Sequence, residues 1–233
     1  MQLHEIIYLL TLGLGLGMVH ALDADHIMAV TGLVSGRPSR RVAMSFCFRW
    51  ALGHGMSLMA FGIGVWILGM ALPTSISAVA ERAVGGVLIA IGLWVLWDLW
   101  GRGAHLHFHR HDDLPKHAHW HEHSHAERTA EDHHTLPHRH RHKATLVGLL
   151  HGTAGSAPLL AIIPVSQHAP AWVAIAYLLI FSFGVLLTML AFGGVLGTVF
   201  HWLGQRGQRL VPWLRGTVAF GAMGLGVFWL IGG

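Results

Sequence analysis

Long apolar stretches separated by short polar segments dominate the pattern along the chain. Six of these stretches match the length of about 20 residues with which a helix crosses the hydrocarbon core of a bilayer. They cover residues 5–34, 42–70, 82–100, 143–165, 171–201 and 210–231. Strands of a transmembrane barrel would alternate and be shorter. The pattern therefore predicts an all-α integral membrane protein with about six transmembrane helices.

Basic residues fall mainly in three loops, which predicts the orientation of the helices. Only 11% of the 233 residues are charged. Arginine and lysine are enriched in cytoplasmic loops of membrane proteins, so we expect these loops in the cytoplasm and both termini outside. The net charge of +4 then reflects topology and not a nucleic-acid partner. The basic loop residues are Arg37, Arg40, Arg41, Arg102, Arg110, Lys116, Arg128, Arg139, Arg141, Lys143, Arg206, Arg209 and Arg215.

The N-terminus and the single cysteine exclude two other interpretations. No lysine or arginine precedes the first apolar stretch, so we expect no cleaved signal peptide there. Cys47 is the only cysteine, which excludes a disulfide within the chain and a thiolate metal cluster. We expect Cys47 to be a small buried side chain.

The two halves of the chain repeat one another at a constant offset of 131 residues. The segment Gly17–His20 aligns with Gly148–His151, and Ala60–Gly62 aligns with Ala191–Gly193. Three spans per half is an odd number, so the halves must cross the membrane in opposite directions. Inverted repeats are typical of secondary transporters, whose site lies at the midplane. The predicted organisation is a first three-helix repeat over 1–100, a His-rich cytoplasmic loop over 101–142 and a second repeat over 143–233.

The first apolar stretch contains His20, Asp23, Asp25 and His26. Ionisable groups inside a span are costly unless they are paired, and a divalent cation would satisfy all four. Imidazoles together with carboxylates indicate a first-row transition metal. On a regular helix Asp25 would point away from the other three, so either Asp25 has another partner or the helix is broken here. The alternative is a helix end at the interface, with both acids as solvated caps.

The second span adds Arg49 and His54. An arginine in an apolar stretch needs an acid, and Asp25 is the expected partner of Arg49. His54 is either a further metal ligand or a buried histidine that is simply hydrogen-bonded.

The fourth span carries the repeat partner of the first motif. His151 is retained, while the positions of the two acids hold Ala154 and Ser156. Pro158 interrupts the helical hydrogen bonds. This segment is therefore predicted to complete the site with His151, Thr153, Ser156 and freed backbone carbonyls.

The loop from 105 to 142 contains fourteen of the 21 histidines. Such a composition cannot form a packed core and binds transition metals weakly and interchangeably. We expect a store for metal in the cytoplasm, or otherwise a spacer.

The sequence HALDADHIMAV, which begins at His20, resembles the HAxDADH signature of the nickel/cobalt transporter family without a mismatch. Leu52–His54 resembles the family's second motif, which usually continues with serine where this chain has Gly55. The resemblance implies that His20, Asp25, His26 and also His54 are metal-site residues. It further implies Ni²⁺ or Co²⁺ as the transported substrate, and urease or hydrogenase maturation proteins as partners. Six spans with a His-rich loop are more similar to the urease-associated and efflux branches than to the eight-span permeases.

These patterns together predict a transporter and not an enzyme. Uptake of nickel or cobalt across the inner (plasma) membrane is expected, with no ATP-binding motif and with the membrane potential supplying about 2.3 kcal/mol per charge per 100 mV. Efflux by proton exchange and a metal-binding sensor or subunit without transport are the alternatives. An intramembrane metallohydrolase is disfavoured, since no H-E-x-x-H occurs. The predicted metal ligands are His20, Asp23, Asp25, His26, His54 and His151.

Overall fold

A computed structural model describes most of the chain as a bundle of helices. The described residues are 1–36, 39–68, 74–101, 107–109, 117–119, 141–154, 170–206 and 210–231. The helices are α1 (Leu3–His20), α2 (Ala24–Val34), α3 (Arg40–Leu68), α4 (Thr74–Gly101), α5 (Arg141–Thr153), α7 (Ala171–Arg206) and α8 (Leu210–Ile231). Two three-residue strands, β1 (His107–His109) and β2 (His117–His119), pair antiparallel. The prediction of a helical fold is confirmed apart from this short ladder.

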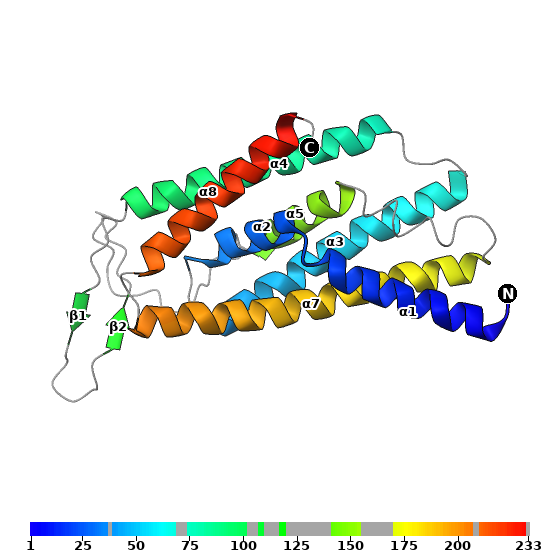
Figure 1. The fold of residues 1–233 in the computed structure, drawn as a ribbon, viewed down its shortest axis with the longest axis horizontal. Helices are drawn as coiled ribbons and strands as arrows, with labels where there is room; N and C mark the ends of the chain where they lie inside the picture. The colour runs from blue at the N-terminus through cyan, green and yellow to red at the C-terminus, as the bar shows by residue number, and fades with distance from the viewer. Residues whose placement is uncertain are drawn as a thin grey trace, which may run out of the picture.

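The helices run along one long axis and share two ends (Figure 1). Helices α2, α4 and α7 end where α3, α5 and α8 begin, and the β1–β2 ladder lies at the same end. We call this the loop end. The N-terminus lies toward the opposite end, here called the N-terminal end, and the C-terminal helix α8 runs in that direction.

The first predicted span is two helices and not one. Helix α1 ends at His20 and α2 begins at Ala24. Asp23 occupies the N-cap of α2 with a non-helical backbone, φ −58° and ψ 145°, but its side chain forms no cap hydrogen bond. Of the two sequence alternatives for this segment, the broken helix is the one that the structure adopts.

The remaining helices agree with the predicted spans to different degrees. Helix α4 begins at Thr74, eight residues before the predicted start, while α8 covers the predicted 210–231. The fourth predicted span corresponds to α5 only as far as Thr153, because residues 155–169 lie outside the described residues. Proline precedes α7 at position 170, where its fixed φ suits a helix start.

Two hydrophobic clusters divide the helices into two groups. The first, which includes Trp50 and Phe181, lies between α3 and α7 and receives residues of the α1–α2 segment. The second, which includes Leu88 and Ala219, lies between α4 and α8. Helix α2 contributes Val30 to the first cluster and Ala29 to the second. It therefore lies between the α3·α7 layer and the α4·α8 layer (Figure 1).

Close helix crossings recur at the repeat offset. A Cβ added to Gly17 of α1 would collide with the carbonyl oxygen of Phe181 on α7, and one added to Gly148 of α5 would collide with that of Trp50 on α3. These two contacts are related by 131 residues on both sides. Glycine at both crossings lets the backbones approach, as in membrane helix pairs.

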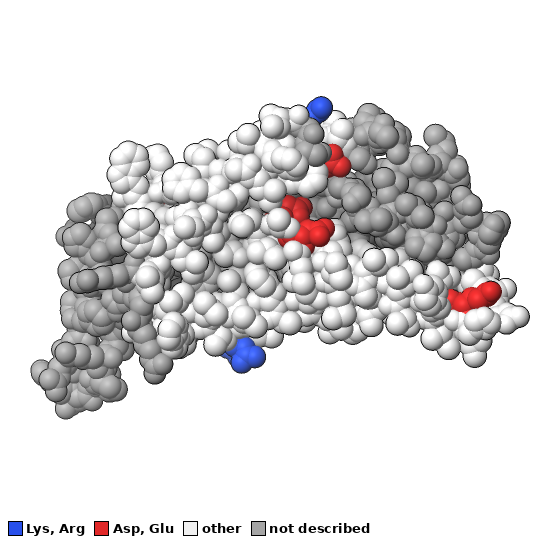
Figure 2. Space-filling model, viewed as in Figure 1, with Lys and Arg blue, Asp and Glu red and all other residues white. Residues whose placement is uncertain are grey.

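Apolar side chains cover most of the described surface. Four helices are long and apolar enough to cross a membrane, namely α1, α4 from Glu81, α7 to Gln205, and α8. Figure 2 shows few charged groups along the bundle. Trp97, Trp202 and Trp213 are exposed at the loop end, and Trp172 at the other end of α7. Tryptophan favours the membrane interfaces, and the 30 residues from Trp172 to Trp202 span about 45 Å, close to a bilayer with its headgroups.

Candidate metal site

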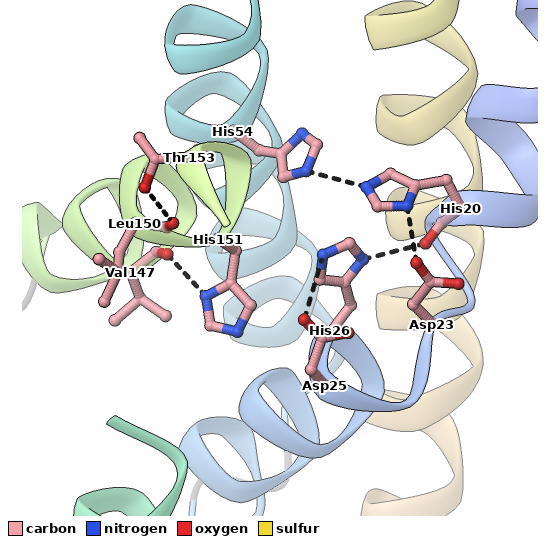
Figure 3. Close-up of polar contacts among 9 residues, drawn as sticks. All are labelled: His20, Asp23, Asp25, His26, His54, Val147, Leu150, His151 and Thr153. Atoms are coloured by element: carbon pink, nitrogen blue, oxygen red, sulfur yellow. Dashed lines mark hydrogen bonds and ion pairs between the residues drawn. The ribbon is translucent and has the colours of Figure 1, made fainter. Parts of the chain in front are cut away.

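The break between α1 and α2 brings ligand-bearing residues together midway along the bundle. The chain leaves α1 through hydrogen bonds from Leu22 N–H to Val19 O and from Asp23 N–H to His20 O. It enters α2 with the Asp23 carbonyl accepting from Ile27 N–H at 3.1 Å. His20 and His26 therefore face one another across the break instead of lying on one helical face (Figure 3).

Three imidazoles from three helices form the centre of the site, here called the histidine cluster (His20, His26 and His54). One ligand nitrogen from each lies within 4.8 Å of the other two. His20 Nε2 is 3.3 Å from His54 Nε2. The His20 and His26 rings are 4.6 Å apart between centroids. His26 and His54 are buried, while His20 is 14% exposed.

Two carboxylates border the histidine cluster from the break and the first turn of α2. His20 Nδ1 contacts Asp23 Oδ2 at 2.7 Å, and His26 Nε2 lies 3.8 Å from Asp25 Oδ2. A second set of potential ligands, Asp23, Asp25 and His26, also has its donor atoms within 4.8 Å. Asp23 is half exposed, whereas Asp25 is mostly buried. Asp25 thus lies beside the histidine cluster, and Asp23 contacts the cluster through the His20 ring.

The fourth-span residues contribute unequally. His151 is buried, and its ring centroid lies 5.5 Å from that of His26. The Thr153 hydroxyl donates to Leu150 O at 2.7 Å and points away from the cluster (Figure 3). Ser156 lies outside the described residues.

The hydrogen bonds define which ring nitrogens are available to a metal ion. A carbonyl can only accept, so His26 Nδ1–H donates to His20 O at 3.0 Å and His151 Nδ1–H donates to Val147 O at 2.8 Å. His20 Nδ1–H likewise faces the Asp23 carboxylate. Nδ1 is thereby the protonated nitrogen of His20, His26 and His151, so Nε2 carries the lone pair with which each of these rings can bind a metal, as is usual for metal-binding histidines. His20 Nε2 accepts a hydrogen bond from His54 Nε2–H at 3.3 Å. Among the described residues His151 Nε2 and His54 Nδ1 have no hydrogen-bond partner.

Two aromatic side chains that the sequence interpretation did not single out form walls of the site. Trp50 stacks on His54 with ring centroids 5.1 Å apart, and it contacts His26 edge-on at 4.8 Å. Phe181 lies 5.7 Å from His20. Trp50 and Phe181 are separated by the repeat offset of 131, which is the signal that could have identified them.

Two predictions about arginines are wrong. Arg49 was expected to pair with Asp25, but the Asp25 carboxylate approaches His26, and Arg49 forms no ion pair within the described ranges. Arg215 was expected in a loop, but it is buried in α8, where Nη2 donates to Asp98 Oδ2 at 2.6 Å. Asp98 was not considered, because it is a single acid near the end of an apolar stretch.

The arrangement suits a divalent transition metal. Neutral imidazole nitrogens with a neighbouring carboxylate favour Ni²⁺, Co²⁺, Zn²⁺ or Cu²⁺ over Mg²⁺ or Ca²⁺. The buried, unpaired Nε2 of His151 is a further nitrogen at the edge of the cluster. A small number of buried donors on separate helices fits binding that can be reversed by helix movement.

Comparisons with known proteins agree with this chemistry. Residues 6–211 match the family described as NicO, high-affinity nickel-transport protein. The chain is similar to the urease accessory protein UreH of Bacillus sp. (strain TB-90), with 28% identity over 199 residues that cover 84% of this chain and 79% of that protein. No solved structure matches the chain.

Proposed function

We propose that the transported ion passes through the histidine cluster. The premise is that the chain belongs to the NicO family of high-affinity nickel-transport proteins and transports nickel or cobalt across a membrane. The observation that carries this proposal is the approach of three ligand nitrogens, from α1, α2 and α3, to within 4.8 Å of one another. Ionisable side chains buried within membrane helices mark ion pathways, and three converging imidazoles are a suitable set of ligands for a transition metal. In this proposal His20, His26 and His54 hold the ion, with Asp25 and His151 completing its shell.

Asp23 has a different part in the proposed site. Its contact at 2.7 Å fixes His20 Nδ1 and thereby directs Nε2 toward the ion. Such outer partners tune affinity without touching the metal. Ser156 and the carbonyls of the fourth span stay predicted contributors.

The proposed architecture is a pair of inverted three-helix repeats with six membrane crossings. It is supported by the crossings of α1 with α7 and of α5 with α3, which correspond at the 131-residue offset. It is further supported by the paired contacts of Phe181 with His20 and of Trp50 with His151. The repeat boundaries 1–100, 101–142 and 143–233 belong to this proposal.

We place the protein in the inner (plasma) membrane with the loop end in the cytoplasm, and we propose uptake. The basic residues near the loop end support this orientation. A divalent ion entering a negative cytoplasm gains about 4.6 kcal/mol at 100 mV, since each charge contributes about 2.3 kcal/mol. The similar Bacillus protein is named for urease, so urease maturation proteins are the proposed recipients. The β1–β2 register, which pairs His107 with His119 and His109 with His117, fits a metal store on the receiving side.

Metal flux into proteoliposomes tests the site. His26→Ala is expected to lower the nickel flux by more than the roughly 10–100-fold that loss of an outer partner costs. His201→Ala is the matched control, because His201 lies exposed on α7, bonded to Gln205. Equal flux in the two variants would contradict passage through the cluster.

Two further outcomes separate the alternatives. Flux that is faster out of vesicles than into them, under an imposed proton gradient, would favour efflux over uptake. Tight nickel binding at the cluster with no flux in either direction would indicate a membrane sensor or subunit.

A further inference from the structure

A buried ion pair joins α4 to α8 near the loop end. Arg215 Nη2 donates to Asp98 Oδ2 at 2.6 Å, and the two side chains are 5% and 9% exposed. Ionisable groups within membrane helices are costly and usually functional. A buried pair is weak evidence for stability, because desolvation offsets its attraction. We therefore looked for a functional role of this ion pair in its position between the helices.

Helix α2 connects this ion pair with the histidine cluster. At its beginning Asp25 lies beside His26. At its other end a Cβ added to Gly36 would lie 3.5 Å from Arg215 Nη2. Between them Gly32 packs against Ile91 of α4, and the Met28 side chain packs against Gly221 of α8. The ion pair thus lies where α4 and α8 meet the segment that follows α2, whose last residue is about 14 Å along the helix from Asp25 at 1.5 Å per residue.

The repeat offset relates this ion pair to a cavity at the other end of α4 and α8. Shifted by 131 residues, Asp98 corresponds to Trp229 and Arg215 to Val84. Both Val84 and Trp229 line a small cavity together with Asp25, Glu81 and Ala154. Its volume of ≈10 Å³ is about the space that one water molecule needs.

The two equivalent places therefore differ in the way that an alternating mechanism requires. They lie 14 residues apart on each helix, about 21 Å. At one place an ion pair joins α4 and α8, and at the other the two helices border a cavity of about one water molecule beside Asp25. In an inverted repeat, contacts between equivalent positions of the two helices, formed at one end and then at the other, would close the path on either side of a central site.

We propose that Asp98 and Arg215 are positioning residues that close the transport path at the loop end. Their ion pair holds α4 and α8 together against the end of α2, so the cluster is reached from the N-terminal end, past Glu81 and Asp25. The pair separates when the ion leaves at the loop end. This inference rests on the proposed passage of the ion through the cluster. Neither residue touches the ion, and both act through the position of α2.

Thiol accessibility in oriented vesicles tests the proposal. In a Cys47→Ala background, Ser35→Cys reports on the loop end of α2, and Val84→Cys reports on the cavity. Both parent side chains are buried. A membrane-impermeant cationic methanethiosulfonate is applied to one side at a time, and the rate of modification is measured without any transport step.

The comparison uses variants that do not leave a single buried charge. Asp98→Asn combined with Arg215→Gln removes both charges, and Asp98→Arg combined with Arg215→Asp reverses them. Arg82→Gln is the control on the exposed surface of α4. The neutral double variant is expected to raise the rate at Ser35→Cys from the loop end by about tenfold and to lower that at Val84→Cys, a shift of about 1.4 kcal/mol between states. The reversed pair is expected to restore the parent rates.

An unchanged rate at Ser35→Cys, in a neutral variant that still binds Ni²⁺ at the histidine cluster, would overturn the proposal. If that variant does not fold, Arg215→Lys keeps the charge and shortens the reach, and an unchanged rate there has the same meaning. Failure of the proposed function is a separate result. It would appear as absent nickel flux in the parent protein, with the accessibility pattern intact.

Discussion

The crossing of α1 and α7 allows a quantitative prediction with an internal control. A Cβ on Gly17 would collide with the carbonyl oxygen of Phe181 and lie 2.9 Å from its carbonyl carbon. The obstacle is backbone, which cannot rotate away. A Cβ on Gly15, half a turn earlier, meets nothing within 4 Å. Both positions lie within the same helix, Gly15 just before its last turn and Gly17 in that turn, so alanine changes the helix propensity in the same direction.

The expected difference follows from these two environments. Alanine at Gly15 is expected to stabilise the protein by up to about 1 kcal/mol through helix propensity. The same gain at Gly17 is opposed by overpacking, which typically costs about 1–3 kcal/mol and more when backbones must separate. Gly17→Ala is therefore expected to be less stable than Gly15→Ala by about 1–3 kcal/mol, a difference in Tm of roughly 3–10 °C. Thermal unfolding of the purified protein in detergent measures it.

The same substitution should disturb the site. Gly17 is one turn before His20, so separation of α1 from α7 moves His20 relative to His54. Nickel affinity, measured by titration, is expected to fall in Gly17→Ala and to stay at the parent value in Gly15→Ala. Gly148→Ala, the repeat partner, is expected to cost a similar amount, since it collides with the Trp50 carbonyl. Equal stability of Gly17→Ala and Gly15→Ala would refute the close crossing and the argument built on it.

Three further outcomes are expected. Asp23→Asn should weaken nickel binding by about 10–100-fold in a binding titration, because His20 loses the carboxylate that orients it; parent affinity would argue against that role. His151→Ala should reduce nickel affinity less than His26→Ala, since His26 and not His151 belongs to the three histidines whose ligand nitrogens lie within 4.8 Å of one another in the described region; a larger loss would place His151 at the centre. Replacing residues 105–140 with a Gly/Ser linker should preserve flux in proteoliposomes and lower the number of nickel ions bound per chain, and loss of flux would refute a storage role.

The sequence predicted the helical fold and the composition of the cluster because both depend on local pattern. Apolar length defines membrane helices, and ionisable side chains within them are rare enough to attract notice. His20, Asp23, Asp25 and His26 were therefore recognised together. Periodicity could not decide whether the helix continues past His20, since a broken helix and a regular one have the same residues there.

The contacts between helices were harder to predict. The sequence predicted Arg215 in a loop because it closely follows Arg206 and Arg209. In the structure α8 begins at Leu210, and Arg215 is a buried residue of this helix. Its partner Asp98 lies 117 residues earlier, a separation that no local pattern reports. Arg49 was assigned to Asp25 because charge balance demands a partner without saying which acid is near. Tertiary packing decides such pairs.

The division of the core into two hydrophobic clusters has a consequence for the cargo itself. His54 is on α3, His151 is on α5, which packs against α3, and His20 is on α1, which packs against α7. His26 and Asp25 are on α2, which also packs against α4 and α8. An ion bound to both sets of ligands joins the two groups of helices, which otherwise meet mainly through apolar contacts. At a concentration one hundred times its Kd, the bound ion adds about 2.7 kcal/mol to the stability of the form in which the two groups of helices are joined. The transported ion is thus a reversible crosslink between the two groups of helices. By reciprocity, any contact that holds these groups together also increases the affinity for the ion.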